Sequence, residues 1–552
     1  MTAPVTVTFL GGLGEVGRNC TCIEVDGRLL LIDFGVMFPD VTMPGVDVIL
    51  PDTEWLKTRA KDIEALIITH GHEDHVGGVP HFLRQFEAPI YGSALSMGIA
   101  HHKVKEARLA HRTELRVVGD GQRIQIGPFD VEFLPITHSV PQSMCIVVHT
   151  PQGVLVHTGD FKLDHTPVDQ RLTDLGRLGA LGADPGIRLL MADSTNADSP
   201  GHSDSETSIG QTFRRLFPDF RGRRLITACF ASHLHRVQQI ADVAIDEGRT
   251  IFPLGRSMVN NVRIAKDLGL LDIPDRHLRD ISDVNDFKPG QVCVICTGSQ
   301  GETMAALALM DRGEHNEITL GPEDVVMLSS HPIPGNEIPV YRIIDGLTRK
   351  GCEVIHDGHE HVHTSGHAKR DELRLLQTIT KPEWFIPIEG EYRMMARHAE
   401  LAIDVGLDED RAIIAVDGDQ VVIRDEGVKI EGRIPAPYHY LHGLLDDVNG
   451  EMLLARRALG EDGYVLITLT INKGRKIVAG PKLVSQGWID EKANPDLVRD
   501  LEALVAKVVK KALAEGVAVE KLERLVRRAT GKFVGDRTRR RPPINAVVLT
   551  AG

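Results

Sequence analysis

Three histidines and an aspartate fall within six consecutive positions near the start of the chain. His70 and His72 alternate after residues 63–68, an apolar run typical of a buried strand, so an extended backbone points both side chains the same way. Asp74 and His75 follow where the chain must already be turning. Imidazole nitrogen and carboxylate oxygen are ligands that Zn²⁺ and Mn²⁺ accept. Four ligands from so short a segment would strain one ion site, so the spacing favours two neighbouring ions over an ordinary polar loop.

Two later strand ends offer further ligands of the same kinds. His138 follows an apolar-alternating run, and Asp160 comes just after a strand expected at residues 153–157. The pattern His-x-His-x-Asp-His, from His70 to His75, resembles the metallo-β-lactamase superfamily. That resemblance implies that His138 completes the first metal site and that Asp160 bridges two metals.

The composition is that of an ordinary soluble globular protein. The chain has 552 residues, enough for three or four domains, of which 42% are hydrophobic and 25% charged. It contains no run of 18 apolar residues and no N-terminal signal pattern, so we expect no membrane span and a cytoplasmic location. Seven cysteines, mostly within apolar runs, indicate free thiols in a reducing compartment. Cys20-x-Cys22 and Cys293-x-x-Cys296 lack a partner pair at zinc-finger spacing.

The net charge of −14 excludes little. Most nucleic-acid-binding domains carry a basic surface, but a centre that holds cations binds phosphate locally whatever the overall sign. Basic clusters occur at residues 221–224 and 537–541. Such clusters are more often a solvated face than a binding patch.

Short strands dominate the first 160 residues. We expect strands at 5–10, 20–25, 29–34, 63–69, 89–91, 116–118, 123–126, 130–134, 144–149 and 153–157, with helices near 78–87 and 93–108. The glycine-rich turn from Gly11 to Asn19 is not followed by a helix. A dinucleotide-binding loop requires such a helix, so this interpretation is rejected. Asp33 ends the third strand at the same end as the proposed metal ligands. This order predicts an αββα sandwich.

From about residue 190 strands and helices alternate regularly. Apolar strands at 225–229, 250–253, 292–296 and 325–328 are each followed by small or polar residues and then a helix, which predicts a parallel sheet with helices on its faces. Serine and glycine at the shared edge leave backbone N–H groups free, which favours a polyanion as ligand. Strands at 384–388, 412–416 and 420–424 then resume the sandwich pattern.

The predicted organisation is therefore an α/β chain of several domains. The αββα sandwich occupies 1–195 and 356–430, a parallel α/β domain is inserted at 196–355, 431–450 is a linker, and 451–552 is a small α+β domain. The last domain has strands at 464–471, 476–478 and 544–550, a helix after Asn494-Pro495 and another near 519–529.

The inserted domain narrows the resemblance to the β-CASP nucleases. Asp193, in Asp-Ser-Thr, and His367, in Ser-Gly-His, match two motifs of that family. Phe230-Ala-Ser-His-x-x-Arg236 resembles its phosphate-contacting helix start. The resemblance to the ribonuclease J family covers essentially the whole chain, including the C-terminal domain. Four further segments carry it: Gly11–Asn19, Asp160-Phe-Lys, His331–Glu337 and Gly390–Arg393.

This resemblance implies a metal-dependent ribonuclease with 5′→3′ exonuclease and endonuclease activity on single-stranded RNA, in RNA maturation and decay. A hydroxide held between two cations would attack phosphorus, His367 would protonate the leaving 3′-oxygen, and Asp193 would fix the tautomer of His367. A histidine that merely caps the next helix is the alternative for His367. The expected catalytic residues are His367, Asp193 and Asp74. The expected substrate-binding residues, including those for a 5′-monophosphate, are His363, Thr364, Ser365, Gly366, His367, Ser232, His233 and Arg236.

One position departs from the family pattern. A histidine usually ligates the second metal where this chain has Glu389. A carboxylate there is a harder ligand, so Zn²⁺ is expected at the first site and Mn²⁺ at the second. The full expected ligand set for two divalent ions is His70, His72, Asp74, His75, His138, Asp160 and Glu389.

Other functions remain open at this point. A β-CASP DNA nuclease is the nearest alternative, followed by a small-ester or thioester metallo-hydrolase and by an RNA-binding scaffold with a degenerate site. The inserted domain and His367 argue against the ester hydrolase, and the near-complete ligand set argues against the scaffold. The C-terminal domain carries no site chemistry, so we expect the chain to form a homodimer through it, with a tetramer as the alternative.

Overall fold

The computed structural model describes residues 2–302, 304–333, 336–443 and 445–551. It contains two compact units, Met1–Phe38 with Ile49–Tyr438 and Pro39–Val48 with His439–Gly552, each with its own apolar core. None of the described helices is long and apolar enough to cross a bilayer.

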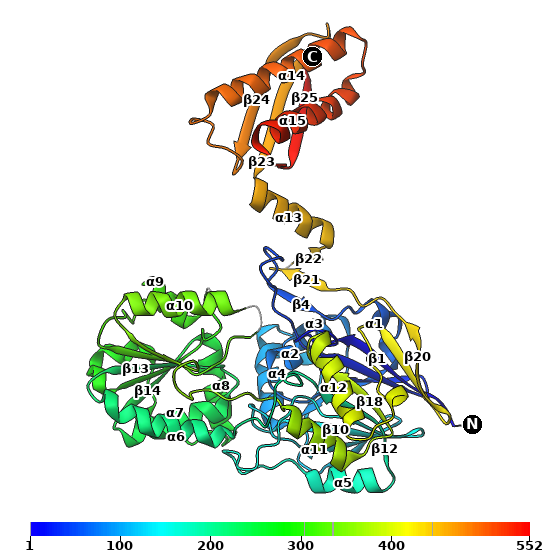
Figure 1. The fold of residues 1–552 in the computed structure, drawn as a ribbon, viewed down its shortest axis with the longest axis vertical. Coiled ribbons are helices and arrows are strands. Elements are labelled where there is room, and N and C mark those ends of the chain that lie inside the picture. Colours follow the sequence, from blue (N-terminus) through cyan, green and yellow to red (C-terminus); the bar gives the residue numbers. More distant parts are fainter. Residues whose placement is uncertain (1, 303, 334–335, 444, 552) are drawn as a thin grey trace. The chain divides into compact units, whose positions relative to one another are not determined.

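The larger unit is built on two facing sheets (Figure 1). The first has the order β20-β19-β1-β2-β3-β5-β6-β7, and its strands are β1 Val5–Gly11, β2 Cys20–Val25, β3 Arg28–Ile32, β5 Ile63–Ile68, β6 Ile90–Gly92, β7 Leu115–Val117, β19 Asp419–Arg424 and β20 Gly427–Arg433. The second has the order β18-β12-β11-β10-β9-β8, and its strands are β8 Arg123–Ile126, β9 Phe129–Pro135, β10 Met144–Thr150, β11 Gly153–His157, β12 Ile187–Asp193 and β18 Trp384–Ile388.

Alternation along β10 shows how the second sheet is buried on both faces. Ile146 belongs to the core between the two sheets, whereas its neighbour Val147 belongs to the core on the outer face. The outer face is covered by α5 Leu175–Ala183, α11 Arg370–Thr380 and α12 Tyr392–Asp404. The remaining helices of this part are α1 Glu54–Thr58, α2 Glu73–Val76, α3 Val79–Gln85 and α4 Ala94–Glu106. The predicted αββα sandwich is confirmed.

The inserted segment forms a five-stranded, all-parallel sheet in the order β14-β15-β13-β16-β17. Its strands are β13 Arg224–Ala228, β14 Thr250–Leu254, β15 Val292–Cys296, β16 Asp324–Leu328 and β17 Glu353–His356. Every residue of β15 and β16 is buried, as expected for a sheet covered on both faces. Figure 1 shows α9 and α10 on one side and α6 and α7 on the other. The helices are α6 Glu206–Leu216, α7 Leu234–Asp246, α8 Arg256–Asp267, α9 Ala306–Arg312 and α10 Glu337–Arg349.

The smaller unit has a three-stranded sheet, β24-β23-β25, with two helices packed on one face. Residues of β23 alternate strictly between buried and half-buried, so one face of the sheet contacts the helices and the other lies open. Its elements are β21 His439–His442, β22 Leu445–Val448, α13 Gly450–Asp462, β23 Tyr464–Asn472, β24 Ile477–Gln486, α14 Pro495–Ala514, α15 Leu522–Thr538 and β25 Ile544–Ala551.

Some sequence expectations need correction. Residues 412–416 form no strand, and only an isolated bridge joins Ala412 to Phe385. The interval 431–450, expected as a linker, contains the end of β20 and the strands β21 and β22. Pattern reading also missed α5, α6 and α13. The helix α5 is short and α13 has no clear apolar stripe, whereas α6 has one, formed by Ile209, Phe213 and Leu216, that was overlooked. Residues 334 and 335 of the His331–Glu337 motif lie outside the described residues.

Candidate metal centre

Seven potential ligands gather where strands of both sheets end. The segment from His70 to His75 follows β5, His138 follows β9, Asp160 follows β11, and Glu389 follows β18. Their donor atoms form two groups, each with all atoms within 4.8 Å of one another. The first group is His70, His72, His138 and Asp160, and the second is Asp74, His75, Asp160 and Glu389. The pairing expected from sequence, with Asp160 common to both, is therefore brought together in space.

The first group has the spacing of a single coordination sphere. His72 Nδ1 lies 3.1 Å from His70 Nε2 and 3.2 Å from His138 Nε2. Asp160 Oδ2 lies 3.5 Å from His70 Nε2 and 3.8 Å from His138 Nε2. Ligand atoms about 2.0–2.2 Å from one tetrahedral ion lie roughly 3.4 Å apart, which is close to these separations.

Hydrogen bonds on the far side of these rings fix which nitrogen faces the centre. His138 Nδ1 lies 2.7 Å from the carbonyl oxygen of Gly366, which can only accept, so Nδ1 carries the proton and Nε2 is left bare. His70 Nδ1 lies 3.0 Å from the Thr69 hydroxyl, which itself donates to Asp33 Oδ2 over 2.8 Å. The hydroxyl therefore accepts from His70, whose Nε2 is also bare.

Burial keeps these imidazoles neutral. It lowers the pKa of His70 and of His138 well below the usual histidine value, and neighbouring imidazoles lower them further. Burial likewise lowers the pKa of His72 to about 3. Neutral imidazole is the form that ligates a metal.

The second group is rich in carboxylates. His75 Nε2 lies 3.2 Å from Asp160 Oδ2, 3.5 Å from Glu389 Oε2 and 3.8 Å from Asp74 Oδ2. Asp33 Oδ2 lies 2.8 Å from His75 Nδ1, which fixes the ring with Nε2 toward the group. Sequence reasoning had placed Asp33 at this end of the sheet without giving it a role.

The three carboxylates of the second group have one cationic side chain among them: burial lowers the pKa of His75, but Asp160 and the other nearby carboxylates outweigh burial and raise it well above its usual value. Burial raises the pKa of Asp74 to about 6 and raises that of Glu389 well above its usual value, with Asp160 adding repulsion at both. Asp160 Oδ1 and Glu389 Oε1 are buried and have no hydrogen-bond partner among the described residues. A buried carboxylate oxygen without a donor is costly, so these oxygens fit a bound divalent cation.

Strained backbone aims two of the carboxylates. Asp33 and Glu389 adopt φ values of 62° and 51°, in the left-handed region that non-glycine residues rarely enter. The Glu389 N–H donates to the carbonyl of Gly12 over 3.1 Å, and its own carbonyl accepts from Ser194 N–H over 3.0 Å. The glycine-rich turn after β1 thus supports Glu389 instead of binding a dinucleotide.

Asn19, at the end of the same turn, also contacts the centre. Its backbone N–H donates to the carbonyl of Asp74 over 3.1 Å, and its Nδ2 lies 3.1 Å from His75 Nε2. Sequence reasoning did not single out Asn19 or Thr69, because an amide and a hydroxyl beside a metal motif have no distinctive spacing.

His367 and Asp193 form a pair beside the two groups. His367 Nδ1 lies 2.7 Å from Asp193 Oδ2, while Asp193 Oδ1 accepts from the N–H and hydroxyl of Thr195 over 2.8 and 2.7 Å. The ring of His367 lies 5.1 Å from that of His138, and its side chain is 20% exposed. Burial lowers the pKa of His367, but Asp193 outweighs burial and raises it to about 9. His367 is thus a protonated acid at neutral pH.

The loop before His367 links the inserted segment to the metal ligands. Ser365 Oγ accepts from Asn196 Nδ2 over 2.7 Å and from the His367 N–H over 3.1 Å. Thr364 Oγ1 donates to the carbonyl of Asp204 over 3.0 Å. A Cβ at Gly366 would lie 2.7 Å from the ring of His138, so only glycine allows the close approach. His363 Nδ1 is buried without a hydrogen-bond partner among the described residues.

Arg236 and His233 lie behind this loop instead of on its surface. Arg236 is fully buried, and its Nε and Nη2 donate to Glu206 over 2.5 and 2.8 Å. Its Nη1 donates to the carbonyl of Val362 over 2.9 Å, and His233 Nε2 lies 3.3 Å from Glu206. The expected phosphate contact does not fit this burial, because a guanidinium enclosed by protein cannot reach a ligand. Ser232, just before α7, is half-buried.

Buried carboxylates that hold this region together were not foreseen. Glu206 anchors Arg236, and Glu372 accepts from the N–H groups of Leu163, Ser203 and Lys369 over 2.8, 2.6 and 2.9 Å. Glu206 and Glu372 each lie in the first turn of a helix. An acidic residue at that position is ordinarily explained by its favourable interaction with the helix dipole. Their long-range contacts left no local signal.

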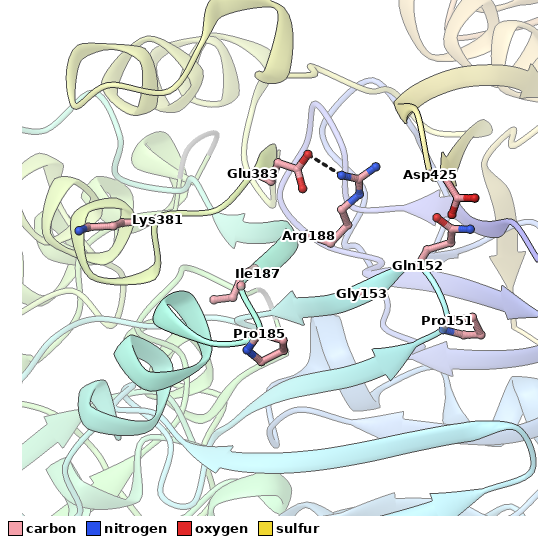
Figure 2. Close-up of a pocket in the computed structure, with 10 residues that line it drawn as sticks. Pro151, Gln152, Gly153, Pro185, Ile187, Arg188, Lys381, Glu383 and Asp425 are labelled. Carbon is pink, nitrogen blue, oxygen red and sulfur yellow. Dashed lines mark hydrogen bonds and ion pairs between the residues drawn. The ribbon is translucent and has the colours of Figure 1, made fainter. Parts of the chain in front are cut away.

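A separate cavity of about 400 Å³ lies at the opposite ends of the strands that carry the ligands. Figure 2 shows it between the turn at Gly153, the start of β12 at Ile187 and residues Lys381 and Glu383. Arg188 in its wall donates to Glu383 over 2.5 Å. Among the residues that the structure describes, those lining this cavity include no histidine and no pair of unpartnered carboxylates, so the chemistry belongs to the metal centre.

The fold and this site define a metal-dependent nuclease of the metallo-β-lactamase superfamily. The family models that match are "Metallo-beta-lactamase superfamily" at residues 13–200, "Ribonuclease J, beta-CASP domain" at 222–347, "Zn-dependent metallo-hydrolase RNA specificity domain" at 354–413 and "Ribonuclease J C-terminal domain" at 451–551. The chain belongs to the ribonuclease J family, and it binds RNA and divalent metal.

Whole-chain relatives support this assignment. Ribonuclease J of Mycobacterium tuberculosis is 41% identical over 98% of this chain and 97% of its own length. Ribonuclease J 1 of Streptococcus pyogenes is 36% identical over 99% and 98%. A solved protein of unknown function from Enterococcus faecalis shares the fold at 16% identity, with a TM-score of 0.53 over 76% of this chain and 100% of that one.

Proposed function

We propose that the protein degrades single-stranded RNA as a 5′→3′ exonuclease and also cuts it internally, in RNA maturation and decay. The observation that carries this proposal is the Asp193–His367 pair, with 2.7 Å between Asp193 Oδ2 and His367 Nδ1, beside two donor groups that share Asp160. A phosphodiester hydrolase needs both a place for cations and an acid for the leaving oxygen.

Each group of residues has a defined task in this reaction. The first donor group would hold one divalent ion and the second another, and bound ions supply the activated water and neutralise charge on the phosphate. His367 Nε2 donates a proton to the leaving 3′-oxygen. Asp193 holds the proton on Nδ1, which keeps Nε2 directed away from the carboxylate and toward the substrate.

The proposed ion at the first group is Zn²⁺ and the one at the second is Mn²⁺. Three neutral imidazoles with one carboxylate suit Zn²⁺, whereas three carboxylates with one imidazole are harder ligands. Metal analysis of the purified protein, followed by activity measured against added Mn²⁺, tests the assignment. Equal loading of both groups with Zn²⁺ and no response to Mn²⁺ would contradict it.

The loop His363–Gly366 is proposed to bind phosphate, including a 5′-terminal monophosphate. Ser365 and Thr364 lie directly before the proposed acid, and Thr364 and Gly366 are held from both sides by hydrogen bonds to Asp204 and His138. RNA labelled at the 3′ end and carrying either a 5′-monophosphate or a 5′-triphosphate tests this. Equal rates of decay for the two RNAs would contradict a binding pocket for the 5′-terminal monophosphate.

A DNA nuclease is the second candidate, because the proposed proton transfer does not involve the 2′-hydroxyl. Comparing cleavage of RNA and DNA of one sequence decides between them. We expect RNA to be cleaved much faster, and comparable rates would favour the alternative. Hydrolysis of a chromogenic ester by the same preparation would support the small-ester hydrolase instead.

Self-association is proposed to occur through the open face of the C-terminal sheet. Val547 and Leu549 on β25 and Val484 on β24 are exposed apolar residues. The strand register pairs Val547 with Thr468, Leu549 with Thr470 and Val484 with Leu466 on β23. Exposed apolar strands favour pairing with a like surface. Val547→Glu with Leu549→Glu should yield a slower-associating or monomeric species in sedimentation. Unchanged sedimentation would exclude this face.

A further inference from the structure

The C-terminal domain differs in charge from the rest of the chain. Residues 451–552 contain 20 lysines and arginines against 12 aspartates and glutamates, a net charge of +8, whereas the whole chain carries −14. This excess has no part in the chemistry described above. The basic residues of this domain include the cluster at 537–541, which the sequence alone predicts to be a solvated face.

The structure collects much of this charge on one side of α15. Leu522, Val526, Thr530 and Val534 form the buried stripe of the helix. Arg524, Arg528 and Lys532 repeat at four-residue intervals outside that stripe, and all three are exposed. Residues four apart on a helix are neighbours, and the row advances by roughly 6 Å at each step.

The row is left uncompensated by the protein. The side chains of Arg524, Arg528 and Lys532 make no hydrogen bond or ion pair with any residue that the structure describes. Like charges at four-residue spacing destabilise a helix, so the arrangement is unfavourable unless an anion lies along it. By contrast, Arg537 lies 3.7 Å from Asp500 and packs over the ring of Phe533.

A hollow continues the row past the helix end. It measures about 640 Å³ and is lined on its basic side by Lys532, Arg539 and Arg541, with Asp536 as its carboxylate. Gly531 and Gly535 leave the helix backbone bare there, and a Cβ at Gly535 would meet nothing within 4 Å. A chain with its own backbone charge could therefore lie close to the helix.

We propose that the basic row Arg524–Arg528–Lys532 and the adjoining hollow form a second RNA-binding surface, which holds the phosphate backbone of the substrate outside the catalytic site. The domain's tryptophan, Trp488, is 2% exposed, so no indole is available as a platform for stacked bases. Recognition is therefore by charge and independent of sequence. The inference rests on RNA as the substrate but not on the order or direction of cleavage.

The sheet and helix faces of the domain have separate tasks in this arrangement. The open sheet face carries the exposed apolar residues proposed for self-association, whereas the basic row lies on α15, which packs against the other face. A second copy of the chain is the competing occupant of the basic row, because the remainder of the protein is acidic. The experiment below measures both RNA affinity and oligomeric state.

The test uses the full chain in a His367→Ala background, so that RNA is bound but cleaved slowly. One variant carries Arg524→Glu, Arg528→Glu and Lys532→Glu, and its matched control carries Lys507→Glu, Lys510→Glu and Lys511→Glu on α14. All six lysines and arginines are exposed, and the two variants change the net charge equally. Affinity for a long single-stranded RNA is measured by fluorescence anisotropy across about 50–200 mM salt.

We expect the row variant to bind RNA at least about tenfold more weakly at physiological salt, with the slope of log K against log salt smaller by about 2, since each single-strand phosphate contact contributes about 0.7. The control should stay within about twofold of the parent protein. A glutamine version of the row guards against misfolding, because it removes charge without adding acidic repulsion, and it should lower the slope similarly.

Two results would overturn the proposal. In one, the row variant and the control bind RNA with the same affinity and salt slope. In the other, RNA affinity is unchanged but the row variant sediments as a smaller species. The basic row would then be a contact surface between two copies of the chain. Cleavage of a very short oligonucleotide by the row variant with His367 restored reports separately on the proposed function and should be unchanged.

Discussion

The two donor groups share Asp160 but differ in charge and in how they are supported. In the first, three imidazoles are held neutral by burial, and hydrogen bonds to Gly366 and Thr69 fix two of their tautomers. In the second, Asp74 and Glu389 have raised pKa values because burial and Asp160 oppose their ionisation. The first group is thus ready to receive an ion, while the second is unfavourable until a cation arrives.

This contrast indicates a division of roles. The imidazole ligands of the first group are neutral and already held in position. They do not repel one another, so they retain a bound ion. A carboxylate-rich set couples binding to relief of repulsion, so its occupancy depends more strongly on ion concentration and on pH. We therefore expect the ion at the first site to stay bound and the ion at the second site to exchange with solution.

The largest expected effect comes from removing a ligand of the first group. His72→Ala should abolish cleavage and release the first ion while the protein stays folded, because His72 Nδ1 contacts the ligand atoms of His70 and His138 and not a packed core. Turnover, metal content and circular dichroism measure this. His101→Ala, at an exposed histidine of α4, is the matched control and should behave as the parent. Full activity and metal content in His72→Ala would refute the two-group centre.

Removing the proposed acid should be the next largest effect. His367→Ala should lower the cleavage rate by about 10²–10⁴-fold with little change in RNA affinity, the usual contribution of a general acid. Single-turnover rates and anisotropy separate the two quantities. Asp193→Asn should show the same pattern, because it removes the acceptor that holds the proton on His367 Nδ1. A loss of affinity with unchanged turnover of bound RNA would make His367 a binding residue.

Substitutions of Glu389 test whether the two donor groups bind their ions independently. Glu389→Ala should weaken only the second site, so that more Mn²⁺ is needed for half-maximal activity while the first ion is retained. Glu389→His should shift the preference of that site toward Zn²⁺, because it replaces a hard oxygen with nitrogen. Metal titrations of the three proteins decide the matter. Identical Mn²⁺ activation curves for the parent and Glu389→Ala would show that Glu389 is no ligand.

The smallest expected effect is on the stability of the metal-free protein. The pKa of Asp74 is raised to about 6 in the folded state, above its ordinary value of 3.8, so its contribution is favourable below the ordinary value and is lost as pH rises through about 6. The buried histidines have lowered pKa values and act in the opposite direction, so the Asp74 contribution is isolated by comparing the parent with Asp74→Asn. After chelation, the melting temperature of the parent minus that of Asp74→Asn should be a few degrees lower at pH 7.5 than at pH 5. A difference between the two proteins that does not change with pH would exclude Asp74 as its source.

Local patterns in the amino-acid sequence were enough to predict the metal motif, the sandwich and the inserted parallel sheet. These depend on local features: alternating histidines directly after a buried strand, and apolar runs followed by serine or glycine at the start of a helix. The family resemblance assigned Asp160 and Glu389 to the metal ligands, and in the structure both follow parallel-paired strands of the second sheet that end at one edge.

The assembly of the centre depends on contacts between distant segments, which become visible in the folded chain. His138 and Gly366 are 228 positions apart, yet their hydrogen bond joins a metal ligand to the loop of the proposed acid. Arg236 looked like a phosphate contact but is fully buried against Glu206, and Glu389 is aimed by a bond from its N–H to Gly12. Contacts between distant segments leave no periodic trace, because each residue type is locally ordinary and acquires its role from the partner that folding brings to it.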